Sequence, residues 1–294
     1  MNCESPAFLD NSKRHASASR RGLLVLLMLS AGATSAVADT LIERGRYLVQ
    51  SIAACGNCHT PRGPNGPIAG KALAGGMAFV EPVFKAYAPN ITPDPQTGIG
   101  RWTHAQIMAS IRDGKRPDGT IIGPPMPIGQ YRSISDRDAA AIAAYLRSVP
   151  AVNSKVPKSE YKIPLPQNYG PPVGRVVEVA RADKIAYGRY LAGPLGHCIE
   201  CHSAPGANGA PDTEQNLGTG GVRFDGPWGT SVSSNITPSN LARYSDAELR
   251  KIITTGVRPD GSHLRPPMGT DAYARMSGSD LAALIAYLRQ LPRK

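Results

Sequence analysis

The sequence predicts an all-α fold made of two tandem copies of one helical unit, and two observations support this prediction. Motifs recur along the chain at a nearly constant offset of 142 to 145 residues, beginning with Gly45–Leu48 and Gly188–Leu191. Both copies also close with apolar residues at helical spacing, whereas the Gly- and Pro-rich stretches between motifs lack the sustained alternation that strands require. A duplicated helical domain explains both observations.

The repeat continues through further motifs in the same order, and these define the domain boundaries. The recurring pairs are Asn90–Pro93 with Asn235–Pro238, Arg116–Gly119 with Arg258–Gly261, Pro124–Met126 with Pro266–Met268, and Ala144–Arg147 with Ala286–Arg289. We therefore expect a first domain over residues 39–150 and a second over residues 176–294. Residues 151–175 form a Pro-rich linker, which we expect to be extended and stiff enough to fix how the domains face each other.

Residues 1–38 are predicted to be an export signal. Basic residues precede the short apolar run Gly22–Met28, and Ala36–Ala38 forms a cleavage site of the A-x-A type. We expect a mature chain that starts near Asp39; the alternative is an uncleaved N-terminal membrane anchor. Cleavage removes Cys3 and leaves four cysteines, all of which lie in repeated motifs.

Two helices can be located within each copy. Thr103-x-x-Gln106 and Ser245-x-x-Glu248 are capping boxes, so a helix should begin after each of them. The closing helices are indicated by apolar residues three and four positions apart. These are Ile142, Tyr145, Leu146 and Val149 in the first copy and Leu284, Tyr287, Leu288 and Leu291 in the second.

The strongest chemical signal is Cys-x-x-Cys-His, which occurs once in each copy. Cysteines three residues apart on a helical turn project to one side, so both thiols can add to the two vinyl groups of one porphyrin. The candidate attachment residues are Cys55, Cys58, Cys198 and Cys201, and the candidate proximal iron ligands are His59 and His202. A redox dithiol and half of a zinc site also use Cys-x-x-Cys, but a dithiol has no use for the histidine, and zinc needs more ligands per half.

A methionine in each copy is the candidate sixth ligand of the iron. Met126 and Met268 lie 71 and 70 residues after the first cysteine of their copy, and each follows two prolines that hold the chain extended. A thioether ligand would raise the reduction potential of the iron. The alternative is a methionine that fills a gap in the core, which suits Met77, Met108 and Met276 better because these have no equivalent in the other copy.

The remaining polar candidates carry weaker signals. His104, His197 and His263 have no histidine at the equivalent position of the other copy, so we expect a surface or structural role for them. The alternative for His263, which is close to Met268, is a contact with a haem edge or propionate. Partly buried haem propionates would need hydrogen-bond donors. The candidate donors, which are equally typical of core edges and loops, are Trp102, Tyr131, Arg116 and Arg258.

With these motifs, each half resembles a class I cytochrome c domain, and the resemblance covers essentially the whole mature chain. It implies two covalently bound haems c, each with a histidine and a methionine on the iron. The blocks Asn90–Asp94, Gly98–Thr103 and Arg116–Gly119 are more narrowly similar to cytochrome subunits of bacterial periplasmic dehydrogenases for alcohols, aldehydes, gluconate and N-heterocycles. The second half departs from this pattern at Ser239 and Tyr244.

The resemblance implies an electron carrier rather than an enzyme, because both coordination sites of each iron would be filled by the protein. We expect a periplasmic dehydrogenase or another redox protein as donor, and a small cytochrome, a quinone-linked complex or a terminal oxidase as acceptor. The alternatives are a dihaem enzyme of the peroxidase or thiosulfate-oxidising type with a displaceable axial ligand, and a docking subunit.

Charge and the predicted signal bear on location and partners. The formal net charge of +11 would fall to +9 once the four basic and two acidic residues of the signal are removed. A moderately basic surface favours acidic redox partners or peripheral association with an anionic membrane. No basic run with interleaved aromatic residues occurs, so nucleic acid is not an expected partner. We expect a periplasmic location, or else an N-terminally anchored chain that faces the periplasm.

Overall fold

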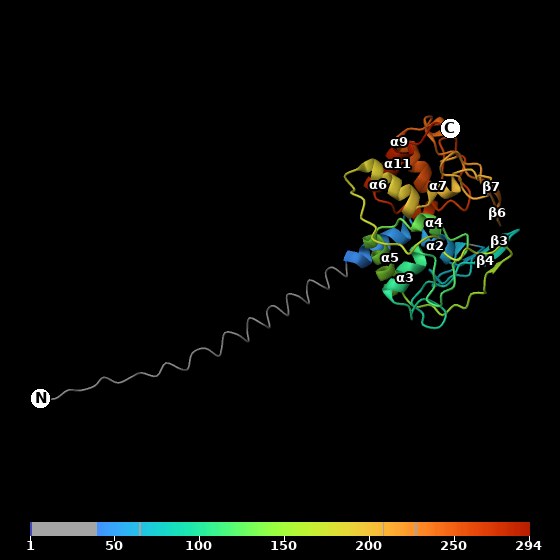
Figure 1. The fold of residues 1–294 in the computed structure, drawn as a ribbon. Coiled ribbons are helices and arrows are strands. Elements are labelled where there is room, and N and C mark those ends of the chain that lie inside the picture. The colour runs from blue at the N-terminus through green and yellow to red at the C-terminus, as the bar shows by residue number, and fades with distance from the viewer. Residues whose placement is uncertain (2–39, 65, 208, 227) are drawn as a thin grey trace. The chain divides into compact units, whose positions relative to one another are not determined.

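The computed structural model describes Met1 and residues 40–64, 66–207, 209–226 and 228–294, so the predicted export signal lies outside the described residues. Leu41–Lys294 forms one compact unit that contains both copies of the repeat (Figure 1). Within the described part of the chain, no helix is long and apolar enough to cross a membrane.

Both halves contain, in the same order, a first helix, a short cysteine helix, a hairpin and three further helices, and each half also has elements without a counterpart in the other (Figure 1). The first half has a helix over residues 40–50, then α2 (Cys55–His59), β1 (Arg62–Gly63), β2 (Gly66–Pro67), β3 (Ala78–Glu81), β4 (Phe84–Tyr87), α3 (His104–Arg112), α4 (Ile128–Tyr131) and α5 (Asp136–Ser148). The second half has α6 (Lys184–Tyr190), the π-helical turn η1 (Leu191–Leu195), α7 (Cys198–Cys201), β6 (Arg223–Gly226), β7 (Gly229–Val232), α8 (Pro238–Leu241), α9 (Asp246–Thr255), α10 (Thr270–Tyr273) and α11 (Gly278–Leu288).

The all-α prediction is confirmed only in part, because each half also contains a short hairpin. β3 pairs with β4 and β6 pairs with β7, both antiparallel, and β5 (Glu160–Tyr161) adds to β4. These strands have two to four residues, which is too short for alternating hydrophobicity to stand out in the sequence. The hairpins lie in the Gly- and Pro-rich stretches where strands were not expected.

The predicted helix starts are confirmed, and both capping boxes are complete. Thr103 Oγ1 accepts a hydrogen bond from the Gln106 backbone N–H, and the Gln106 side chain accepts one from the Thr103 N–H. Ser245 and Glu248 form the same pair at the start of α9. Each box satisfies two backbone N–H groups that the first turn of a helix leaves without an intrahelical partner.

The first helix of each half crosses the closing helix at a glycine. A Cβ on Gly45 would lie 1.9 Å from the Ala141 carbonyl oxygen, and a Cβ on Gly188 would lie 2.1 Å from the Ala283 carbonyl oxygen. Only glycine permits backbones to approach this closely. The crossing buries most of the apolar face predicted for the closing helices. Its residues Ile142, Tyr145, Leu146, Leu284, Tyr287, Leu288 and Leu291 are buried, whereas Val149, which follows the end of α5, is only partly buried.

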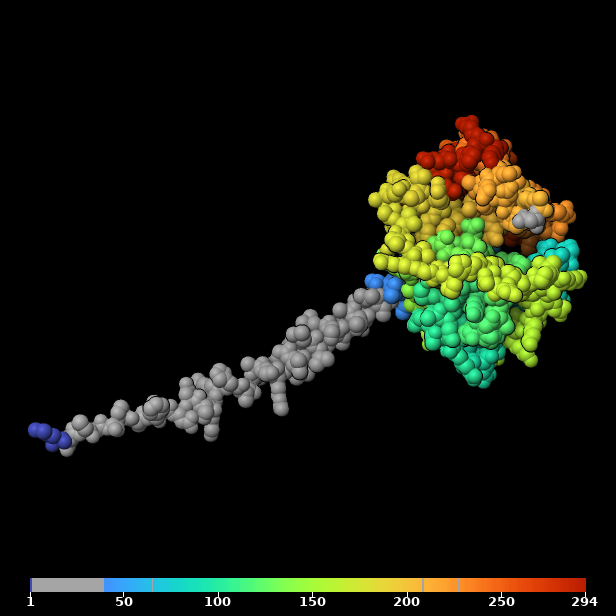
Figure 2. Space-filling view, viewed as in Figure 1, coloured from blue at the N-terminus to red at the C-terminus, as the bar shows by residue number. Residues whose placement is uncertain are grey.

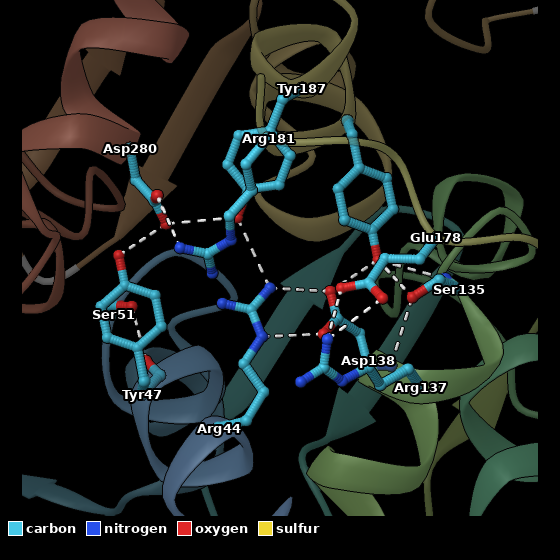
Figure 3. A network of polar contacts seen from close by, with 11 residues as sticks. Arg44, Tyr47, Ser51, Ser135, Arg137, Asp138, Glu178, Arg181, Tyr187 and Asp280 are labelled. Carbon is cyan, nitrogen blue, oxygen red and sulfur yellow. Dashed lines mark hydrogen bonds and ion pairs between the residues drawn. The ribbon is translucent and has the colours of Figure 1, made fainter. Parts of the chain in front are cut away.

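The two halves are joined by a reciprocal pair of hydrogen bonds (Figure 3). Tyr47 of the first half donates its hydroxyl to Asp280 Oδ2 of the second half at 2.7 Å. Tyr190 of the second half donates to Asp138 Oδ2 of the first half at 2.9 Å. Each tyrosine thus reaches the first turn of the other half's closing helix.

Arginines complete this network around the two buried carboxylates (Figure 3). Arg44 forms two hydrogen bonds to Asp138, at 2.8 and 2.9 Å, and Arg181 lies 3.7 Å from Asp280. Both aspartates are only 1% exposed, so these partners compensate for their lost hydration. Direct polar contacts therefore join the two halves.

Residues 151–175 lie along the first half (Figure 2, yellow-green). The Val152 carbonyl accepts a hydrogen bond from Asn90 Nδ2 at 2.7 Å, and β5 joins the edge of the first hairpin. Tyr161 and Tyr169 donate their hydroxyls to the carbonyls of Pro124 and Ile122, both at 2.8 Å. The Pro-rich segment is thus packed against the loop that leads to Met126.

Candidate functional site

The four predicted attachment cysteines lie on two matching short helices, α2 and α7. The residue before each helix, Ala54 or His197, adopts a left-handed backbone conformation with φ of 45° or 40°. This turn directs the chain into the cysteine helix. All four thiols are free and half-buried. Both motifs therefore present an unpaired pair of thiols from one helical turn.

Burial raises the pKa of these thiols, and the direction is the same at every position. The pKa of Cys58 and of Cys198 is raised to about 11, and that of Cys55 and of Cys201 to about 12, mainly by desolvation. A site that disfavours thiolates suits sulfur atoms that carry no charge, as in thioethers. The environment of the four cysteines thus fits covalent attachment of a porphyrin.

The two predicted proximal histidines are each oriented by a backbone carbonyl. His59 Nδ1 lies 2.8 Å from the Pro89 oxygen, and His202 Nδ1 lies 2.7 Å from the Ser234 oxygen. A carbonyl can only accept, so Nδ1 must donate, which leaves the lone pair of Nε2 free for a metal. Burial lowers the pKa of both imidazoles and favours this neutral form.

The two predicted axial methionines occupy equivalent loops. Met126 and Met268 are partly buried and pack against the apolar core, each immediately before a short helix, α4 or α10. Met276 is buried in the core and Met108 packs against it, which agrees with the gap-filling role expected for unpaired methionines.

Two buried tyrosines lie close to the attachment cysteines. Tyr131 follows Met126 by five residues and is 6% exposed, and Tyr273 holds the equivalent position and is 9% exposed. Burial raises the pKa of both hydroxyls, with further contributions from Cys55 and Cys58 at Tyr131 and from the second motif at Tyr273. Tyr131 therefore lies near the first motif, where a propionate or a porphyrin edge could reach it.

The other candidate donors have backbone partners. Arg116 Nη1 donates to the Ile121 carbonyl at 3.0 Å, and Arg258 Nη1 donates to the His263 carbonyl at 3.3 Å. Each guanidinium thus closes the turn before its methionine loop, which supports the alternative loop role. Trp102 is partly buried at the core, and its carbonyl accepts a hydrogen bond from Arg147.

The unpaired histidines divide between surface and interior. His104 and His263 are exposed. His197 packs edge-on against the Tyr131 ring, with 5.9 Å between ring centroids, and burial lowers its pKa to about 4. His197 thus has a structural role in the contact between the halves. Among the described residues, no group of three or more His, Cys, Asp and Glu side chains is placed to hold a metal ion.

The structure also brings the first motif next to the second methionine loop. Asn57, which lies between Cys55 and Cys58, donates its side-chain amide to the Pro267 carbonyl at 2.9 Å. Sequence reasoning missed this residue, because neither position between the cysteines carries a recognisable signal. The two candidate sites are therefore linked by direct contacts. Hereafter the first site comprises Cys55, Cys58, His59 and Met126, and the second site comprises Cys198, Cys201, His202 and Met268.

Comparisons with known proteins agree with this geometry. Residues 42–150 match the family model described as cytochrome c. The chain is 32% identical over 270 residues to one of the subunits of nicotinate dehydrogenase from Pseudomonas putida, covering 85% of the chain and 21% of that protein. It is 31% identical over 269 residues to the fructose dehydrogenase cytochrome subunit of Gluconobacter japonicus, covering 86% of the chain and 53% of that protein.

A third relative matches over most of its own length. The chain is 28% identical over 250 residues to a dihaem c-type cytochrome of Cereibacter sphaeroides, covering 81% of the chain and 82% of that protein. By contrast, the chain spans only about a fifth and about half of the lengths of the two dehydrogenase subunits. Residues 42–150 therefore match the model of the cytochrome c family, whose domains bind haem c covalently, and the chain as a whole is similar to a cytochrome subunit of fructose dehydrogenase and to a dihaem c-type cytochrome.

Proposed function

We propose that this chain is a dihaem c-type cytochrome that carries electrons from a periplasmic dehydrogenase to an acceptor of the respiratory chain. The observation that carries the proposal is the repeated histidine geometry. In both halves the carbonyl that faces Nδ1 leaves Nε2 free, and two half-buried thiols lie on the preceding helical turn. Because each half has its own histidine and pair of thiols, the chain is suited to hold two haems rather than one.

In this proposal each half holds its haem with its own residues. Cys55 and Cys58 would attach the first haem, and Cys198 and Cys201 would attach the second. His59 and Met126 would hold the iron of the first haem, and His202 and Met268 would hold that of the second. When bound, each haem would supply the chemistry of a one-electron carrier. Because protein groups fill both axial positions, the chain would move electrons without binding a substrate at the metal.

The proposed partners follow from the names and chemistry of the relatives. Two of them are named as subunits of nicotinate and fructose dehydrogenases, which supports a dehydrogenase as the electron donor. The proposed acceptor is a small cytochrome, a quinone-linked complex or a terminal oxidase. Residues 1–38 would export the chain to the periplasm, residues 39–150 and 176–294 would be the two haem domains, and residues 151–175 would connect them.

The test replaces each methionine separately in the purified haem protein. A pyridine haemochrome assay should give two haems per chain. Met126→His and Met268→His should each remove about half of the weak far-red band that arises from methionine bound to ferric iron. Each should also lower one of the two reduction potentials by on the order of 0.1 V, a fraction of the range that axial ligands control.

The control variant is Met276→Leu, which changes a buried core methionine and should leave the band intact. One haem per chain would contradict the dihaem proposal. A high-spin ferric signal from either site would instead favour the alternative of a dihaem enzyme with an open or displaceable ligand. A chain that purifies only within a permanent assembly and is not reduced by a dehydrogenase would favour a docking subunit.

A further inference from the structure

The loop that carries Met268 has few groups by which the protein can hold it. Pro266 and Pro267 precede the methionine, and neither has a backbone N–H. Their carbonyls are the only backbone groups that these two residues offer for hydrogen bonding. Ser231 Oγ donates to the Pro266 oxygen at 2.6 Å, and Asn57 Nδ2 donates to the Pro267 oxygen at 2.9 Å. Both available carbonyls are therefore used.

The two donors come from different halves of the molecule. Ser231 belongs to β7 in the same half as the loop. Asn57 belongs to α2 in the first half, 210 positions away from Pro267. The contact extends past the methionine, because a Cβ on Gly269 would lie 3.6 Å from Asn57 Nδ2 and 3.7 Å from Ala54 Cβ. The segment on both sides of Met268 thus packs against the residues that begin the first motif.

We propose that Asn57 is a positioning residue for Met268, so that the attachment motif of the first site holds the axial-ligand loop of the second site. This inference rests on the proposed function, because it assumes that Met268 is a ligand. Asn57 lies between two cysteines that covalent attachment would fix, so its amide would be a rigid donor. The Pro267 carbonyl directly precedes Met268, so its hydrogen bond restrains the residue that presents the thioether.

The equivalent position in the second motif does not repeat this bond. Glu200 stands there in place of Asn57, and among the described residues its carboxyl forms no hydrogen bond to the loop before Met126. The loop before Met126 instead receives the hydroxyls of Tyr161 and Tyr169 from residues 151–175. Among the described residues, the hydrogen bond from a motif to the other half's Pro-Pro-Met loop therefore runs from the first site to the second, whereas in the opposite direction His197, before the second motif, makes a ring contact with Tyr131.

The experiment measures how easily added imidazole displaces each methionine from ferric iron. In a Met126→His background the far-red band reports on Met268 alone, and in a Met268→His background it reports on Met126 alone. In the first background, Asn57→Ala should lower the imidazole concentration at half-displacement about fivefold, which corresponds to the ~1 kcal/mol of a typical intramolecular hydrogen bond. Asn57→Asp has the same shape but places a carboxylate against the carbonyl, so its effect should be larger.

Two controls separate positioning from a general loss of structure. Asn57→Ala in the Met268→His background should leave the displacement of Met126 unchanged, although the substitution lies in the motif of that haem. Asn153→Ala removes a side-chain amide of the connecting segment, residues 151–175, that donates to Gln96 of the first half at 3.3 Å, and it should change neither titration. Haem content and thermal unfolding measured on each variant verify that it is folded.

The outcomes distinguish this inference from the proposed function. If the Met126→His protein has no far-red band, Met268 is not a ligand, and both the function and the inference are wrong. If the band is present and both Asn57 variants titrate like their parent, only the inference is overturned. It is also overturned if the Asn57 variants loosen Met126 as much as Met268, because the effect would then be general.

Discussion

The two Pro-Pro-Met loops have the same sequence pattern but are held by different neighbours. In the first half, the linker hydroxyls of Tyr161 and Tyr169 bind the carbonyls of Pro124 and Ile122. In the second half, Ser231 binds the loop from the hairpin of its own half, and Asn57 binds it from the other half. The candidate ligands therefore recur in both halves, whereas the residues that support them differ.

The two sites also differ in the exposure of their histidines. His59 is buried, with 7% of its surface exposed, whereas His202 is only partly buried. A more exposed site stabilises the charged ferric state and lowers the reduction potential. If both irons have the proposed histidine and methionine ligands, the first site should therefore have the higher potential. In this proposal the second site would also depend on a residue outside its own half, so its ligand geometry would require that the two halves stay in contact.

The substitutions with the largest expected effect test whether the two halves unfold independently. Gly45→Ala and Gly188→Ala each place a Cβ within about 2 Å of a backbone carbonyl where two helices cross. Such overpacking should destabilise the protein by about 3 kcal/mol. Because Tyr47 and Tyr190 connect the halves, either substitution should shift a single cooperative unfolding transition of the whole unit.

Urea unfolding followed at both the haem absorbance and the far-ultraviolet circular dichroism would measure this effect. Gly174→Ala is the matched control, because a Cβ at that position would meet no atom within 4 Å. It should change the free energy of unfolding by less than about 0.5 kcal/mol. Two separate transitions, with only the substituted half destabilised, would show that the halves are independent and that their contacts contribute little.

The local features of each half could be predicted from the sequence because they depend on residues close together in the chain. The capping boxes at Thr103 and Ser245 involve a residue and its neighbour three positions later. The apolar spacing of the closing helices likewise repeats within two turns. The candidate haem residues stood out because the motif occurs twice and the methionines recur at matching positions.

The contacts between the halves could not be predicted in this way. Tyr47 and Asp280 are 233 positions apart, and Asn57 and Pro267 are 210 positions apart. No spacing rule relates such pairs, and a polar residue between two cysteines looks the same whether it faces solvent or another half. The hairpins were missed for a different reason, since strands of four residues are too short to show a period of two.

A smaller effect arises where the two motifs differ in charge. Burial raises the pKa of Glu200 to about 7 from its ordinary value of 4.5, whereas Asn57 at the equivalent position does not titrate. Between these two pH values the unfolded chain has lost this proton and the folded chain keeps it. The free energy of unfolding should therefore fall as pH rises from about 4.5 to about 7, by on the order of 2 kcal/mol.

Glu200→Gln removes the titrating group but keeps its shape, so this part of the pH dependence should disappear. Urea unfolding at about pH 4.5 and about pH 8 measures the difference for both proteins. The control is Glu214→Gln, which alters an exposed carboxylate of the same half. If the free energy of unfolding has the same pH dependence in the parent and in the Glu200→Gln variant, the pKa of Glu200 is not raised by the fold.

The smallest expected effect concerns the linker hydroxyls, and it completes the comparison of the two loops. Tyr161→Phe and Tyr169→Phe each remove one hydrogen bond to the first loop but keep the ring, which for Tyr161 packs directly on Gly123. Each bond contributes about 1 kcal/mol, so each variant should make Met126 about fivefold easier to displace with imidazole. Met268 should be unaffected, because neither hydroxyl bonds to its loop. Tyr87→Phe, in the neighbouring strand β4, is the matched control. If the linker variants loosened both methionines equally, the two loops would share their support, and the asymmetry between the sites would have to arise from Asn57 alone.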